Sequence, residues 1–245
     1  MKKLSLLNVR VDDVTLEEIG SISLELISKR EPSIFISLGS LTVMQARKDP
    51  AYRALIKEAA LVICDGAGVS SAVKFLSGRK IERLTGVDLV PFFFKLAEEK
   101  GLKIFILGSK KDVIAEAARV LKKSYPKADI CGYLDGYFDI INPVEVINVI
   151  KKTSPDILLV GLGQPRQEKW LKENLKALAV PVTMGVGGSF DVIAGKIKRA
   201  PVVFRKLGLE WLFRMMIEPW RLKRNAALAG FIYLIIKNKL TGGKE

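Results

Sequence analysis

The stretch PDILLVGLGQPRQEKW (residues 155–170) decides the fold of this chain. Its first half, Asp156–Val160, is an apolar run between proline and glycine, which predicts a short buried strand. Gly161 and Gly163 then allow a tight turn in which the backbone can approach a ligand, and Pro165 suits the first turn of a helix. Such a junction directs free N–H groups and the positive end of the helix dipole at one spot. The pattern is equally typical of an anion-binding turn and of an ordinary strand-to-helix connection.

The same unit recurs along the chain. Short apolar strands are predicted at 9–11, 33–37, 61–64, 103–107, 130–133 and 180–184, with helical segments between them. Most of these strands end in Gly or Asp. This alternation predicts an α/β fold, a Rossmann-like parallel sheet flanked by helices. The strand ends would gather at one edge and form a single cleft, in which Gln164, Arg166 and Gln167 would reach a phosphate, sugar or base.

Charge divides the chain into two parts. The net charge of the 245 residues is +14, and residues 196–245 hold 12 Lys and Arg against 3 Asp and Glu, a net charge of +9. The first 195 residues therefore carry the remaining +5. We expect an α/β catalytic domain over residues 1–195 and a basic, amphipathic helical appendage over residues 196–245. The balance indicates an acidic partner such as a nucleotide, a nucleic acid or an anionic membrane.

The absence of histidine restricts the chemistry. Ser-His-Asp and Cys-His catalysis and histidine metal sites are excluded, so a general base must be a carboxylate or a less usual group. Asp65 follows the predicted strand 61–64 directly and is the best-placed candidate, although capping the next helix is its plain alternative. No Asp-x-Asp pair is present, which favours a reaction without a metal ion. No glycine cluster completes a dinucleotide fingerprint or a Walker motif.

The remaining composition points to the cell interior. Cys64 and Cys131 both lie in apolar runs and are expected to be buried, free thiols. Polar residues interrupt the apolar N-terminal stretch, so it does not read as a signal peptide. Both observations favour a reducing, cytosolic location.

The tail combines basic and apolar features. Residues 202–219 have helical periodicity, and three basic residues then precede the 11-residue apolar run Ala226–Ile236. That run is too short to span a bilayer, for which about 20 residues are needed. It predicts a segment lying in the membrane interface. The alternative is a helix pair packed on the core or on a second copy of the chain, whereas nucleic acid is disfavoured by the aliphatic content.

A set of ordered motifs resembles one known family. They are RKDP (47–50), DGAG (65–68), GVD (86–88), DGY (135–137), GLGQPRQEKW (161–170), GVGGSFD (185–191), KRAP (198–201) and LEWLFR (209–214). Together they resemble the WecG/TagA/CpsF glycosyltransferases, most closely the TagA branch, over nearly the whole chain. One position differs, because Ser37-Leu38-Gly39 stands where the family usually has Thr-x-Asn.

The resemblance implies an inverting transfer of N-acetylmannosamine from UDP-N-acetylmannosamine to undecaprenyl-diphosphate-linked N-acetylglucosamine, for wall teichoic acid synthesis. The enzyme would need no cofactor and would act peripherally on the cytoplasmic face of the cell membrane. Asp65 would be the general base and Arg83 would stabilise the departing diphosphate. Ser37 and Gln167 match further catalytic positions. The positions that the resemblance assigns to substrate binding are Gly136, Tyr137, Gln164, Gly185, Val186, Gly187, Asp191, Arg214, Arg221 and Arg224.

Several alternatives stay open at this level. In one alternative the acceptor class is the same, but the donor sugar is N-acetylmannosaminuronic acid or glucose. A nicotinamide-dependent oxidoreductase would use the glycine turns for a dinucleotide. A non-catalytic membrane-docking module would use only the tail. Association with further copies of the same chain, as a homo-oligomer, also stays open.

Overall fold

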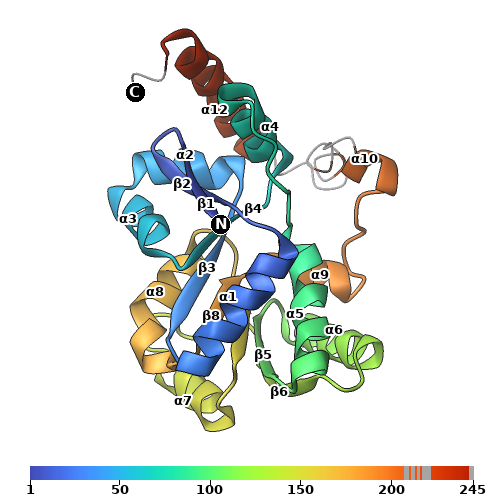
Figure 1. Cartoon of the computed structure of the whole chain (residues 1–245). Helices are drawn as coiled ribbons and strands as arrows, with labels where there is room; N and C mark the ends of the chain where they lie inside the picture. Colours follow the sequence, from blue (N-terminus) through green and yellow to red (C-terminus); the bar gives the residue numbers. More distant parts are fainter. Residues whose placement is uncertain (207–209, 211–212, 214–215, 217–221, 243–245) are drawn as a thin grey trace.

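The computed structural model describes residues 1–206, 210, 213, 216 and 222–242. In this part of the chain one eight-stranded sheet has the order β1-β2-β4-β3-β8-β7-β5-β6 (Figure 1). The strands from β2 to β6 in this order are parallel, and β1 pairs antiparallel with β2. The strands are β1 Lys2–Leu6, β2 Val9–Asp13, β3 Ser33–Leu38, β4 Leu61–Cys64, β5 Lys103–Gly108, β6 Asp129–Leu134, β7 Ile157–Gly161 and β8 Val182–Gly185. The predicted α/β fold is therefore confirmed.

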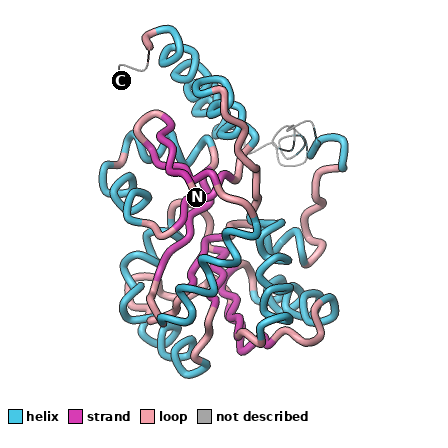
Figure 2. The backbone as a smooth tube through the Cα atoms, viewed as in Figure 1, coloured by secondary structure: helices cyan, strands magenta, loops and turns pink. Residues whose placement is uncertain are grey.

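Helices cover both faces of the sheet, and the strands lie between them in Figure 2. One apolar cluster joins α1, α5, α6 and α9 to side chains such as Phe35. The other joins α2, α3, α4, α7, α8 and α12 to side chains such as Ile34 and Ile36, because successive strand residues point to opposite faces. The described helices are α1 Leu16–Lys29, α2 Ser40–Lys48, α3 Pro50–Glu58, α4 Ala67–Ser77, α5 Gly86–Lys100, α6 Lys111–Ser124, α7 Val144–Thr153, α8 Arg166–Leu178, α9 Ser189–Ile193, α10 Val202–Lys206 and α12 Leu222–Leu240.

The strand order places a crevice at the centre of the sheet. After β3 the chain moves outward to β4, and it then crosses to the other half, where β5 and β6 lie. The last strand, β8, returns between β3 and β7. Ligands of open α/β sheets bind where the strand order reverses, outside the carboxyl ends of the strands. The ends of β3, β4 and β8 are therefore the expected position of a site.

The N-terminal hairpin is absent from the sequence-based prediction, which begins its first strand at Val9. Strands β1 and β2 are joined through Leu7 and Asn8, which have φ angles of 51° and 62°. Two consecutive positive φ angles are typical of the type I′ turn, whose twist matches that of a hairpin. Leucine is an unusual residue for this conformation, so the turn carries no sequence signal.

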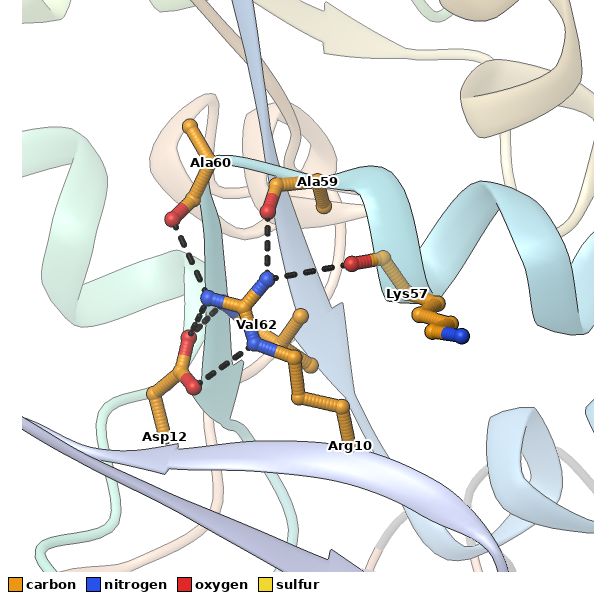
Figure 3. A network of polar contacts seen from close by, with 6 residues as sticks. All are labelled: Arg10, Asp12, Lys57, Ala59, Ala60 and Val62. Atoms are coloured by element: carbon orange, nitrogen blue, oxygen red, sulfur yellow. Dashed lines mark hydrogen bonds and ion pairs between the residues drawn. The ribbon is translucent and has the colours of Figure 1, made fainter.

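A buried ion pair attaches this hairpin to β4 (Figure 3). Arg10 donates from Nε and Nη2 to the two carboxylate oxygens of Asp12, at 2.8 and 2.7 Å. Its guanidinium also donates to the carbonyls of Ala59, at 2.6 Å, and Ala60, at 3.2 Å. Asp12 Oδ2 accepts the N–H of Val62 at 2.8 Å, and Asp12 is 1% exposed. The network therefore fixes the strand that leads to Asp65.

Replacing Arg10 by Met is expected to destabilise the fold by about 3 kcal/mol, because a buried carboxylate loses its cation. Chemical denaturation gives this free energy of unfolding. The control is Lys29→Met, which removes an exposed ion pair with Glu25 and is expected to change little. Equal losses in the two variants would contradict the importance of the Arg10 network.

The tail helix packs on the α/β core. Helix α12 contacts α2 and α4, and Phe231 and Ile235 are buried in the same apolar cluster as α2 and α4 (Figure 1). This matches the core-packing alternative for this part of the tail, while the division of the chain at residue 195 stays a prediction. None of the described helices is long and apolar enough to cross a membrane. Cys64 is buried, as predicted, whereas Cys131 is only half-buried.

Candidate active site

One cavity of about 780 Å³ opens at the carboxyl ends of β3, β4 and β8. It brings together Gly39 and eight of the predicted site residues: Ser37, Asp65, Arg83, Gln164, Gln167, Gly185, Val186 and Gly187. Apolar side chains of α4 and α12, such as Phe75 and Phe231, also line the cavity. The cavity thus has a polar end over the sheet and an apolar end under the tail helix.

Asp65 lies at the polar end, directly after β4. Its backbone N–H donates to the carbonyl of Leu38 at 3.1 Å, which extends the pairing of β3 and β4 by one residue. The N-cap of α4 is Gly66, so Asp65 does not occupy the capping position that was its alternative role. A carboxylate held by the sheet at the edge of a cavity has the geometry that a general base requires.

Arg83 approaches the same end of β4 from the loop before α5. The N–H of Leu84 donates to the carbonyl of Cys64 at 2.8 Å, which fixes this loop against the strand. Burial, and after it the charge of Asp65, raises the pKa of the Cys64 thiol to about 12, while the charge of Arg83 opposes the rise. Both charges therefore act at the end of β4.

The tail contributes one acidic side chain to this end. Arg83 Nη1 lies 3.8 Å from Oε2 of Glu210, which also lines the cavity. The sequence pattern does not indicate a site role for Glu210, because the spacing of this residue fits a charged helical stripe. An arginine guanidinium at the wall of a cavity is suited to bind an entering diphosphate.

Gln164 joins the loop after β7 to the end of β3. Its Nε2 donates to the carbonyl of Ser37 at 2.8 Å, and its Oε1 accepts the hydroxyl of Thr42 at 2.9 Å. The Ser37 hydroxyl is buried and lies 3.5 Å from the carbonyl of Gly185. Both side chains thus hold neighbouring strand ends at the cavity wall.

Gly39 leaves room in the cavity where the family usually has Asn. It has a φ of −99°, which any residue adopts. A Cβ atom at this position would meet only Thr42 Oγ1, at 3.8 Å. A side chain at residue 39 would therefore fit without a backbone change.

Gln167 bridges the two glycine turns. Its Oε1 accepts the N–H of Gly163 and the N–H of Gly187, each at 3.1 Å. A Cβ at Gly185 would lie 2.3 Å from Gln167 Nε2, so the strand end needs glycine there. The amide is 1% exposed and both of its ends are engaged within the protein. Its geometry is that of a side chain that positions the turns after β7 and β8.

Glu168 holds the amide of Gln167 in this orientation. Its Oε1 accepts Gln167 Nε2 at 2.7 Å, and the whole side chain is buried. Burial raises the pKa of Glu168 to about 7, although the hydrogen bond from Gln167 opposes the rise. The sequence pattern does not indicate that Glu168 is buried, because a glutamate beside a lysine in a helix is usually a surface residue.

Glu168→Gln is expected to change the pH dependence of stability. A raised carboxyl pKa in the folded state stabilises the protein below pH 4.5, and this stabilisation is lost as the pH rises to about 7. Relative to wild type, the variant should gain about 3 kcal/mol in unfolding free energy between pH 4.5 and pH 8. Urea denaturation at several pH values measures this difference. Glu173→Gln, at an exposed position of α8, is the matched control. If Glu168→Gln gains no more unfolding free energy than Glu173→Gln, the raised pKa of Glu168 is contradicted.

Three predicted substrate-binding residues do not line the cavity. Tyr137 is 75% exposed, while its neighbour Phe138 packs against Trp170 with ring centroids 5.7 Å apart. The N–H of Gly136 donates to the carbonyl of Ser109 at 2.9 Å. Asp191 accepts the Ser109 hydroxyl at 3.1 Å, next to the turn that contains Gly187. These residues form a second group, over β5 and β6.

The tail arginines fall mostly outside the described residues. Arg214 and Arg221 are not described, and the side chain of Arg224 in α12 is not among those described. Among the described residues, no three His, Cys, Asp or Glu side chains gather as a metal site. Arg166, on the first turn of α8, is exposed and is not part of the cavity lining.

Comparison with known proteins agrees with this architecture. The model of the "Glycosyl transferase WecG/TagA/CpsF family" matches residues 4–245. The N-acetylglucosaminyldiphosphoundecaprenol N-acetyl-beta-D-mannosaminyltransferase of Staphylococcus aureus (strain NCTC 8325 / PS 47) is 33% identical over 239 residues, 97% of this chain and 93% of the relative. The protein of the same name from Bacillus spizizenii (strain W23) is 32% identical over 200 residues, 82% of this chain and 77% of the relative. The chain therefore belongs to the WecG/TagA/CpsF family of glycosyltransferases.

Proposed function

We propose that this chain transfers N-acetylmannosamine from UDP-N-acetylmannosamine to a polyprenyl-diphosphate-linked N-acetylglucosamine. The observation that carries the proposal is a single cavity whose lining combines Asp65 and Arg83 with apolar side chains of α4 and α12. An acceptor with a sugar diphosphate head and a hydrocarbon chain has the same two-ended chemistry. The names of the Staphylococcus and Bacillus relatives describe a transferase with such an acceptor.

The reaction is a single displacement. Asp65 removes the proton from the acceptor hydroxyl while the hydroxyl oxygen attacks the anomeric carbon of the donor. The bond from that carbon to the diphosphate breaks, and UDP leaves with the electron pair. Arg83 stabilises the negative charge on the departing diphosphate. Attack from the side opposite the leaving group inverts the anomeric configuration.

Other groups orient the substrates. Gln167 would fix the glycine turns at the cleft, and Gly136, Tyr137 and Asp191 would contact the uridine. We further propose that residues 196–245 attach the enzyme to the cytoplasmic membrane face, which their net charge of +9 supports. No metal ion is assigned a step, since the chain lacks an Asp-x-Asp pair.

A donor panel tests the proposal. Full-length protein is mixed with a short-chain acceptor analogue, EDTA, and UDP-N-acetylmannosamine, UDP-N-acetylmannosaminuronic acid or UDP-glucose in turn. UDP release should require both substrates and should be fastest with UDP-N-acetylmannosamine. UDP release only with another donor would indicate that the enzyme acts in the synthesis of a different surface polysaccharide. Loss of release in EDTA, restored by a divalent ion, would contradict the metal-free step.

A further inference from the structure

The apolar end of the cavity lies between two helices. Helix α4 contributes Phe75, and α12 contributes Leu228, Phe231, Ile232 and Ile236. The positions on α12 are spaced by three and four residues, so they form one stripe along the helix. Phe75, Ile232 and Ile236 are each about half exposed, which leaves apolar surface available along this side of the cavity.

Specific contacts hold α12 over the cavity. A Cβ at Gly230 would lie 3.3 Å from the end of Met44 in α2, so the two helices approach closely there. Lys239 Nζ lies 5.6 Å from the ring centroid of Phe75 and donates to the carbonyl of Leu76 at 3.4 Å. These contacts fix the helix at its middle and near its C-terminal end, and Ile232 and Ile236 line the cavity between them.

The apolar wall is continuous with the polar end of the same cavity, which holds Asp65 and Arg83. A ligand that fills both ends needs an anionic head and an unbroken hydrocarbon chain. Water is a poor occupant of the apolar end, because apolar side chains offer it no hydrogen-bond partners. An exposed apolar strip that leads out of an active site is best covered by the chain of the substrate itself.

On the basis of the proposed function, we propose that the slot between α4 and α12 binds the first isoprene units of the acceptor lipid inside the protein. The lipid would leave the bilayer by several carbon atoms and would be held by Phe75, Ile232 and Ile236. The diphosphate and its sugar would then extend toward the polar end, where the acceptor hydroxyl would meet Asp65. The bound chain would thus determine how far the acceptor hydroxyl enters the cavity.

The test uses acceptor analogues with one head group and increasing numbers of isoprene units, in solution without vesicles or detergent micelles. For wild type, kcat/KM should rise about ten-fold or more over the first units and then level off. In Ile232→Ser and Ile236→Ser this rise should be lost. Tyr233→Ser and Leu240→Ser are matched controls, since both residues are exposed on α12 and neither lines the cavity. Both control variants should keep the rise of kcat/KM with the number of isoprene units.

A second measurement locates the chain directly. An analogue with a photoreactive group on its first isoprene unit should cross-link to residues 72–76 and 228–236 of the full-length protein. Equal kcat/KM for all chain lengths, or cross-links confined to other segments, would overturn the lipid slot and leave the proposed transferase in place. Absence of transfer to every analogue would overturn both proposals. Equal loss of the rise in the Tyr233 and Leu240 variants would also overturn the slot.

Discussion

Replacing Asp65 by Asn is expected to reduce transfer by about 10²- to 10⁴-fold, the usual contribution of a general base. The amide keeps the size of the carboxylate and one acceptor oxygen, but it cannot take up the proton of the acceptor hydroxyl. The backbone N–H of Asp65 pairs with Leu38, so the loop should keep its position. UDP release in the presence of both substrates measures the effect, and kcat should fall more than donor affinity.

Two controls separate this loss from misfolding. A UDP titration and the thermal unfolding temperature of Asp65→Asn should both match wild type. Asp139→Asn changes an exposed carboxylate that is not part of the cavity lining, and it should leave turnover unchanged. Turnover of Asp65→Asn within about two-fold of wild type would rule out Asp65 as the base, because proton transfer by a positioned group contributes far more.

Replacing Arg83 by Gln is expected to lower kcat by about 10²- to 10³-fold, as removal of a charge-stabilising donor does. The guanidinium is in place before the reaction, since the N–H of Leu84 fixes its loop to the carbonyl of Cys64. Arg83→Lys should recover part of the rate, because a point charge remains while the bidentate geometry is lost. Steady-state kinetics with saturating donor gives kcat for wild type, Arg83→Gln and Arg83→Lys.

Glu210→Gln is the matched control for Arg83. Glu210 Oε2 lies 3.8 Å from Arg83 Nη1, so the substitution removes the charge of the partner and preserves its size. It should preserve the charge of the guanidinium and should affect kcat far less than Arg83→Gln. Equal losses in both variants would indicate that the ion pair itself, rather than the charge of Arg83 on the leaving group, is required.

The sequence predicted the strand ends well because local chemistry determines them. Apolar runs that stop at Gly or Asp identified β3, β4, β5, β7 and β8. Asp65 was placed at the cleft for the same reason. The hairpin strand β1 was missed, since its turn is formed by Leu7 and Asn8 rather than by glycine.

The roles of the glutamine side chains depend on contacts that no local pattern contains. Gln167 joins Gly163 to Gly187, which lies 20 residues away in the sequence, and its amide orientation depends on the buried Glu168. Similarly, the periodicity of the tail predicts a helix but not its partner. The packing of α12 on α2 and α4 is a tertiary contact that the composition left open.

The most direct measurement of the proposed chemistry is the anomeric configuration of the new glycosidic bond. The disaccharide lipid made from an α-linked donor is isolated and examined by NMR. A single displacement with Asp65 as base predicts a β linkage. An α linkage would require two successive displacements or attack on the same face as the leaving group, and it would contradict a single displacement with Asp65 as base.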